Sequence, residues 1–420
     1  MLTNFPIFSY IFLLQKSIFA SSFLYLTAES LNSIEKRATA SLAFVFVLRM
    51  LGLFMLMPVL ALYAQHLEHY SYIWVGIAIG AYGCTQALFQ IPAGWLSDRF
   101  GRKPIIIIGL VIFALGSLIA ANATSLYWVA IGRGIQGMGA IAAAVLALAA
   151  DLSRESQRTK VMAVIGISIG MSFALAMVLG PVLAGQFGLS GLFYIIAAMA
   201  FVAIVIVQWG VPNPVNINNH NPKVVKISGV KKVLADNRLI KLDYGVFIIH
   251  WIMTATFIAL PLQLLEHQVM KDQHWAFYLP VFILSFVVLG PLMKINRKAP
   301  RRANSIAISL LILGISMLAL NFDSLWLLGI GAWMYFSGFN FLEASMPSLL
   351  TKLAPEQYKG SATGVYSTSQ FLGAFMGGVA GGMVMQSYGA FALYCLSILL
   401  LISLLVCWRK LIVNDKAIAA

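Results

Sequence analysis

Four ionisable side chains stand inside long apolar stretches of the chain: Arg49, Arg133, His250 and Glu343. A charge in the interior of a membrane is costly, so residues of this kind are expected to face a partner or a polar cavity. Glu343 is the one acid placed deep in such a stretch, and a carboxyl group shielded from water can hold a proton near neutral pH. We therefore expect proton chemistry at Glu343, with Arg49 and His250 as further candidates, and we expect Arg133 to face a polar cavity or a partner. A structural ion pair between Glu343 and Arg49 is an equal alternative, and packing is the favoured role of His250.

A second group of charged residues falls in a short polar hairpin, Gly94 to Pro104, between two apolar stretches. Charges this close together do not sit in hydrocarbon, so the hairpin must turn the chain at a membrane face. Positive charge at that face explains the basic residues of the hairpin. It does not explain Asp98, in a chain with only 14 acids.

Composition places the chain among polytopic membrane proteins. Its 420 residues are 60% hydrophobic and 10% charged, with a mean hydropathy of +0.88, whereas soluble domains are about 25% charged. The net charge of +14 is better explained by basic residues on the cytoplasmic face than by nucleic-acid binding. The three cysteines, Cys84, Cys395 and Cys407, lie in apolar runs without paired spacing, so we expect packing roles and neither a disulfide nor a metal site. No cofactor is expected.

Apolar stretches long enough to cross a membrane follow one another from residue 39 onward. All but four of the 28 Lys and Arg residues (Lys16, Arg49, Arg133 and Lys271) lie in segments on the side of the charged hairpin, which predicts that this side and both termini are cytoplasmic. The twelve expected spans are about 39–64, 72–96, 104–121, 125–150, 160–186, 190–211, 240–265, 273–295, 303–321, 324–350, 361–386 and 389–408.

The chain also repeats itself. A shift of about 196 residues lays Gly94–Pro104 on Gly290–Pro300, and a similar shift lays Gly180–Gly185 on Gly377–Gly382. Two parallel repeats place a substrate site between the halves, near the middle of the membrane. The chain begins with an extension at 1–34 of unclear status, for which we favour a surface-lying segment over a signal peptide. The expected division of the rest is a six-helix bundle at 35–211, a cytoplasmic linker at 212–238, a second bundle at 239–411 and a tail at 412–420.

Three motifs make the chain similar to the major facilitator superfamily. The hairpin resembles the family's signature Gly-x-Leu-Ser-Asp-Arg-x-Gly-Arg-Lys, span 4 resembles Arg-x-x-Gln-Gly-x-Gly-Ala, and span 5 resembles the antiporter signature Gly-Pro-x-x-Gly-Gly, with Ala184 replacing a glycine. The matching residues are Gly94, Asp98, Arg99, Gly101, Arg102 and Lys103, then Arg133–Ala140, then Gly180, Pro181 and Gly185.

The resemblance implies a fold of twelve membrane-spanning helices in two pseudo-symmetric six-helix bundles. It implies that Asp98 and Arg102 form a conformational latch, with Asp98 facing the start of span 11 at Gly360–Ser361 and Asp151 in the same charge cluster. It implies proton coupling for Arg133. Further strings between Glu35 and Arg409 resemble one bacterial member that carries a soluble α/β domain after its last span, so regulation by such a domain is not expected here.

These patterns predict a monomeric secondary transporter of the bacterial inner membrane, with protons, small molecules and lipid as its partners. The antiporter signature favours proton-coupled efflux of drug-like or amphipathic molecules by alternating access; the alternative is a facilitator or symporter for one polar metabolite. A membrane enzyme or sensor is disfavoured, because no cluster of His, Asp and Cys appears. The aromatic and methionine side chains are suited to an apolar binding cavity, but they are equally suited to the packing of helices. Polar candidates for the cavity are Gln136, Gln263, Tyr335, Asn340, Tyr366 and Gln370.

Overall fold

The computed structural model describes residues 30–213, 227–296, 299–355 and 358–413. In this part of the chain the secondary structure is helical, and the one β-type contact is an isolated bridge between Glu68 and Ser125. The all-α expectation is therefore confirmed. The expected extension at 1–34, the central part of the linker and the end of the tail lie largely outside the described residues.

The first half of the chain begins with α2, whose first turn is closed by a capping box. The Asn32 side chain accepts from the Glu35 backbone N–H, and the Glu35 carboxylate accepts from the Asn32 N–H, each at 2.8 Å. The half contains α2 (Ser33–Phe54), α3 (Leu60–Tyr63), η1 (Ala64–His66), α4 (Tyr72–Phe100), α5 (Arg102–Ala121), α6 (Leu126–Met138), α7 (Ala142–Asp151), η2 (Glu155–Gln157), α8 (Arg158–Val205) and the π-helical turn η3 (Ile206–Gly210).

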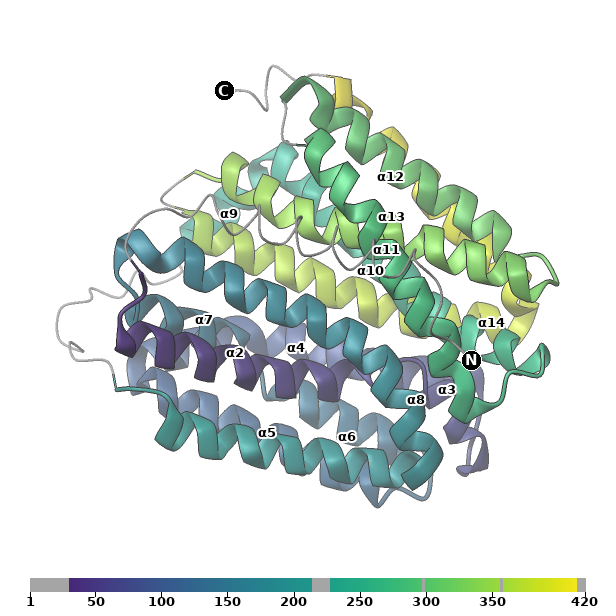
Figure 1. The fold of residues 1–420 in the computed structure, drawn as a ribbon, viewed down its shortest axis with the longest axis horizontal. Helices are drawn as coiled ribbons and strands as arrows, with labels where there is room; N and C mark the ends of the chain where they lie inside the picture. The colour runs from purple at the N-terminus through teal and green to yellow at the C-terminus, as the bar shows by residue number, and fades with distance from the viewer. Residues whose placement is uncertain (1–29, 214–226, 297–298, 356–357, 414–420) are drawn as a thin grey trace, which may run out of the picture.

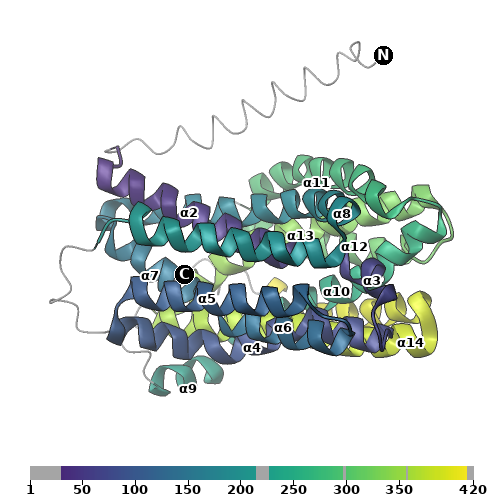
Figure 2. The same ribbon diagram turned by 90° about the horizontal axis from the view of Figure 1, so that it is seen from below.

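The second half follows a short helix, α9 (Ile227–Ala235), which occupies part of the expected linker and contacts α10 and α14. In Figure 2 it lies at the lower edge of the molecule. The half contains α10 (Asn237–Glu266), η4 (Lys271–Gln273), α11 (His274–Asn296), α12 (Ala299–Ala319), α13 (Leu325–Leu353) and α14 (Lys359–Val413).

Backbone geometry repeats between the halves. Gly188 inside α8 and Gly389 inside α14 both have positive φ (68° and 76°) with ψ of −176°, and each divides its long helix into two segments. His69 and Gln268, in the loops after the first helices of each half, have φ of 57° and 63°. Both pairs are about 200 residues apart, which is the spacing of the repeat seen in the sequence.

Nine helical segments of the described chain are long and apolar enough to cross a membrane. Counting α8 and α14 twice, because of the breaks at Gly188 and Gly389, and adding the shorter apolar helix α12, gives twelve. The helices lie side by side in two groups, with α2 to α8 in one and α10 to α14 in the other (Figure 1).

The two halves touch most closely along α4 and α14. We call the end of the molecule with Asp98, Arg102, Asp151 and Arg154 the charged end; α7 and α9 lie toward it and α3 lies toward the opposite end (Figure 1). In the half of α4 remote from the charged end, a Cβ on Gly80 would lie 2.8 Å from the Phe375 carbonyl oxygen.

The halves separate toward the charged end. A Cβ on Gly360 or Gly364 of α14, or on Gly166 or Gly170 of α8, would have no atom within 4 Å. On α4, a Cβ built on Gly94 would meet only the Ala143 Cβ of the same half, at 3.5 Å. The described conformation is thus closed at the opposite end and open at the charged end.

Candidate functional site

Arg102 is the centre of the hairpin cluster. Gly101 takes a φ of 95°, a conformation that favours glycine, and starts α5 directly after α4. The guanidinium of Arg102 pairs with Asp98 one turn earlier, donates through Nε to Asp151 Oδ2 at 3.3 Å, and donates through Nη1 to Ser97 Oγ at 2.8 Å. One side chain therefore ties the end of α4, the start of α5 and the end of α7 together.

The cross-half contact implied for Asp98 is not formed in this conformation. No hydrogen bond in the described residues joins Asp98 to the start of α14, where Gly360 stands in open space. Arg99 lies outside the ion cluster and packs its guanidinium over Trp95 and Phe100, 5.7 and 5.5 Å from the ring centres. Lys103 donates to the Val211 carbonyl at 2.5 Å. The closed form of the latch stays a prediction.

A second ion pair at the charged end was not expected. Arg154 Nε donates to Glu35 Oε1 at 2.9 Å, and its backbone N–H donates to the same carboxylate oxygen at 3.0 Å. The Glu35 side chain is almost fully buried, at 2% exposure. The sequence analysis assigned no role to Glu35, and no local signal pointed to Arg154 as its partner.

Arg133 lies buried inside the first half, beside an aromatic ring. Its Nη1 donates to Gln136 Oε1 at 2.8 Å, its Nε donates to the Ala78 carbonyl at 3.3 Å, and its guanidinium lies 5.0 Å from the Tyr82 ring centre. Gln136 Nε2 in turn donates to Ser117 Oγ at 2.7 Å. Gln136, expected to line the cavity, is fully buried and supports Arg133 instead.

Arg49 approaches the other side of this network. Its Nη2 donates to Gln86 Oε1 at 2.8 Å and to the Gly139 carbonyl at 3.1 Å, and its guanidinium lies 5.9 Å from the Tyr82 ring centre. Its Nε and Nη1 are buried without a hydrogen-bond partner among the described residues. The structure does not bring Arg49 to Glu343.

Glu343 meets two residues from other helices of the second half. Gln370 Nε2 of α14 donates to Glu343 Oε1 at 3.1 Å and lies 2.8 Å from His250 Nε2 of α10. Because a carbonyl can only accept, the contact of His250 Nδ1 with the Val246 carbonyl at 3.0 Å places the ring proton on Nδ1. Nε2 then accepts from Gln370, and it lies 3.6 Å from Glu343 Oε2. We call Glu343, His250 and Gln370 the polar triad.

Of the other cavity candidates, Asn340 and Tyr366 lie near the triad, whereas Gln263 and Tyr335 lie in the interior of the second half. Asn340, one turn from Glu343 on α13, donates to Ser285 Oγ at 3.0 Å, and Tyr366 is buried one turn before Gln370. Gln263 bonds within its own half, to the Leu320 carbonyl and the Tyr394 hydroxyl. Tyr335 is 1% exposed and stacks on Phe339.

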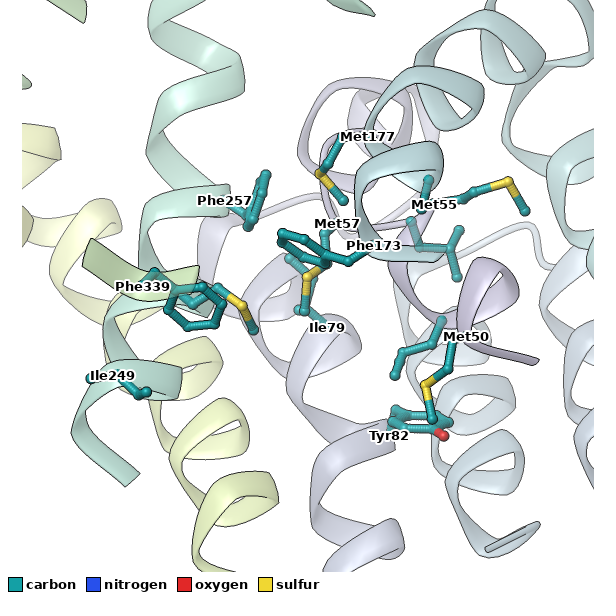
Figure 3. Packing of buried hydrophobic residues seen from close by; sticks show 14 of the residues in the cluster. Met50, Met55, Met57, Ile79, Tyr82, Phe173, Met177, Ile249, Phe257 and Phe339 are labelled. Carbon is teal, nitrogen blue, oxygen red and sulfur yellow. The ribbon is translucent and has the colours of Figure 1, made fainter. Parts of the chain in front are cut away.

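An aromatic and methionine cluster joins the two halves next to the triad. Phe173 of α8 makes ring contacts with four phenylalanines of the second half, at centroid distances between 5.4 and 6.5 Å. Figure 3 shows Phe173 between Phe257 and Phe339 on one side and methionines of the first half on the other. We call these residues the Phe173 cluster: Phe173, Phe257, Phe282, Phe336, Phe339, Met57 and Met177. The sequence offered abundant aromatic residues but no spacing that singled out Phe173.

The glycines of the antiporter motif serve close packing. A Cβ on Gly180 would lie 2.5 Å from the Met55 carbonyl oxygen, and one on Gly185 would lie 2.8 Å from the Asp272 Cβ of the second half. Beside Asp272, Lys271 Nζ donates to the Leu62 carbonyl at 3.1 Å. Pro181 is buried within α8. Gly185 therefore lies where η4 closes on the first half at the opposite end.

One buried acid escaped the sequence analysis. Asp243 of α10 is 6% exposed, so Glu343 is not the only acid inside the second half. Its position near the end of an expected span made it look like an edge residue. The described residues contain no group of three or more His, Cys, Asp and Glu side chains placed to hold a metal ion.

Comparisons with known proteins agree with this architecture. A family model described as Major Facilitator Superfamily matches residues 42–378 and 244–418. The chain is 46% identical over 354 residues to the inner membrane transport protein YajR of Escherichia coli, covering 83% of this chain and 78% of that protein. It is 36% identical to an uncharacterized transporter of Buchnera aphidicola, covering 83% and 90%. A bacterial homologue of the human lysosomal transporter Spinster has the same fold, with a TM-score of 0.73 at 13% identity over 93% of this chain and 98% of that one.

Proposed function

Since this chain belongs to the Major Facilitator Superfamily, we propose that it is a proton-coupled antiporter that exports lipophilic or amphipathic molecules by alternating access. The family establishes a multi-pass transporter that works by secondary transport. Proton coupling, the substrate class and the direction of transport are the proposal.

The observation that carries the proposal is the contact between the polar triad and the Phe173 cluster. The His250 ring lies edge-on to Phe339, with centroids 5.5 Å apart. The Glu343 side chain is 38% exposed in the conformation open at the charged end, whereas His250 is 7% exposed. A lipophilic molecule seated against Phe339 would therefore occupy space beside the groups that bind a proton. Mutual exclusion of proton and substrate is the condition for antiport.

The residues of the Phe173 cluster support a lipophilic substrate class. Its side chains offer ring faces and flexible thioethers, which adapt to apolar molecules of different shapes. A specific polar metabolite would need several fixed hydrogen-bond partners. Gln136 and Gln263, which could have served, are engaged within their own halves.

The triad supplies a physical step for coupling. With His250 neutral, Nε2 accepts from Gln370 and the Glu343 carboxylate also accepts from Gln370. When a proton binds, either Glu343 becomes neutral or His250 Nε2 gains a hydrogen that it can donate to Glu343. Both outcomes change the contacts that join α10, α13 and α14, so the proton can bias the packing of the second half.

The distribution of charge and the relatives support one orientation in the membrane. The basic residues of the charged end favour the cytoplasmic side, and YajR is an inner membrane protein by its name. We place the chain in a bacterial inner membrane as a monomer with both termini in the cytoplasm, with bundles at 35–211 and 239–411. The conformation seen is then open to the cytoplasm, and Asp98 with Arg102 would latch the charged end in the other half of the cycle.

The test uses the purified protein in liposomes with an imposed pH gradient and an internal pH-sensitive dye. Lipophilic cations and sugars are added one at a time. We expect several unrelated lipophilic compounds to dissipate the gradient, and Glu343→Gln to slow this at least tenfold. The exposed Glu155→Gln serves as the matched control. Proton flux with one polar solute only would favour the metabolite facilitator, and no proton flux with any compound would refute antiport.

A further inference from the structure

A second carboxyl group lies buried in α10, two helical turns before His250. Neither carboxylate oxygen of Asp243 has a hydrogen-bond partner among the described residues. No basic side chain in that part of the chain interacts with it. A buried charge without a partner is costly, and such a group ordinarily relieves the cost by binding a proton. The surroundings of Asp243 therefore favour a carboxyl group that binds a proton. Asp243 has no structural ion pair in the described residues and does not belong to the polar triad.

The packing of α10 against α14 fixes where Asp243 lies relative to the triad. A Cβ on Gly373 would overlap Phe247, one on Gly377 would overlap Trp251, and one on Gly381 would lie 3.0 Å from the Ala255 Cβ. Residue numbers rise together on both helices, so the two run in parallel from the charged end. Asp243 thus lies on the charged-end side of His250, about 10 Å along the helix.

Tyr366 interacts electrostatically with both carboxyl groups. It precedes Gln370 by one turn on α14, so the two side chains share a face of that helix. Its hydroxyl is buried without a hydrogen-bond partner in the described chain, and it interacts electrostatically with both Glu343 and Asp243. The hydroxyl therefore lies within the electrostatic reach of an acid from α13 and an acid from α10.

We propose that Asp243 is a second proton-binding carboxyl of the transport cycle, connected to Glu343 through Tyr366. The transfer requires hydrogen bonds from Glu343 to Tyr366 and from Tyr366 to Asp243, which the described conformation does not contain. Once they form, the Glu343 acid gives its proton to the Tyr366 oxygen while the Tyr366 hydroxyl gives its own to the Asp243 carboxylate. Glu343 ends ionised, Asp243 ends neutral and Tyr366 is unchanged. Among the described titratable groups, Tyr366 is the one that interacts electrostatically with Asp243. The helices α3, α4, α9 and α13 also contact α10, but none of their described charged groups interacts with Asp243. The inference rests on the proposed proton coupling.

The first test detects the proton directly and needs no substrate. Infrared difference spectra of the purified protein, recorded while pH is raised, report each protonated carboxyl group by its carbonyl stretch. We expect one band to disappear in Asp243→Asn and another in Glu343→Gln, with both retained in the exposed Asp323→Asn control. If Asp243→Asn removes no band, the proposal is wrong. This result does not depend on whether antiport is established.

The second test asks whether that proton takes part in transport. In liposomes, Asp243→Asn should lower the number of protons moved per substrate by about half while substrate exchange without a gradient continues, and Asp243→Glu should restore the wild-type ratio. A wild-type ratio in Asp243→Asn would overturn the proposal. Tyr366→Phe keeps the aromatic ring, so the variant is expected to fold. It should retain both infrared bands but slow deuterium exchange at the Asp243 band several-fold. An unchanged exchange rate would refute the connection between Tyr366 and Asp243.

Discussion

Gly76 of α4 lies directly against Gly378 of α14, with each backbone occupying the space that a side chain on the other would need. A Cβ built on either glycine would overlap the carbonyl oxygen of its partner. The same pair of helices separates toward the charged end, where Gly364 has nothing near it. The two halves are therefore held together by backbone contact at one end, and opening that end for transport must break this contact.

The first prediction concerns this contact. Gly76→Ala should reduce transport about tenfold or more, because the added methyl group meets backbone, which cannot move aside as a flexible side chain can. Gly314→Ala, on α12, where an added Cβ would meet no described atom within 4 Å, is the control and should transport at the wild-type rate. Uptake into liposomes measures both. Equal rates in the two variants would show that the Gly76 contact is not used in the cycle.

A second prediction concerns the ring that lies close to both Arg49 and Arg133. Tyr82→Leu should lower the free energy of unfolding by about 1–4 kcal/mol, because it removes two buried cation–π contacts. Tyr82→Phe keeps the ring and loses only a hydroxyl that has no hydrogen-bond partner among the described residues. We expect the phenylalanine variant to be within about 0.5 kcal/mol of wild type. Denaturant unfolding in detergent compares them, and equal losses would indicate that the hydroxyl matters, not the ring.

A third prediction separates the stability of the hairpin cluster from its role as a latch. Asp98 is part-exposed and Arg102 keeps Asp151 as a second partner, so Asp98→Asn should change the free energy of unfolding by less than about 1 kcal/mol. If Asp98 latches the charged end, the same variant should increase several-fold the ratio of the conformation open at that end to the conformation closed there.

The matched control for this latch experiment is Asp236→Asn, which removes an ion pair with Arg238 outside the hairpin. Labelling of a cysteine placed at Gly364 reports how often the charged end is open. Normal transport and unchanged labelling in Asp98→Asn would rule the latch out.

A fourth prediction concerns the opposite end. Lys271 donates to the Leu62 carbonyl and lies 5.6 Å from the Tyr63 ring centre, so it joins η4 to the first half. Lys271→Met should loosen this closure and raise labelling of a cysteine placed at Gln65 by a membrane-impermeant reagent several-fold. Lys231→Met, in the exposed face of α9, should leave labelling unchanged. Similar labelling in both variants would exclude Lys271 from the closure.

The spans, the internal repeat and the turn within the hairpin Gly94–Pro104 could be predicted from the amino-acid sequence. Each depends on local properties: the length of an apolar run, a spacing of about 200 residues, and a backbone conformation that glycine adopts freely. The same local logic identified Arg133 and Glu343 as unusual, because a charge within an apolar run is visible without knowledge of its partners.

Which of these residues contact one another became clear from the packing of the helices. In a soluble helix the apolar face marks the interior, but lipid is as apolar as leucine, so a membrane helix can be apolar on every side. The sequence therefore did not reveal that Gln136 is buried against Arg133 or that Glu343 meets His250 and Gln370 rather than Arg49. Nor did it reveal that Asp243 is buried with no hydrogen-bond partner among the described residues. The contacts of Glu343 join helices far apart in the chain, so they depend on how α10, α13 and α14 pack.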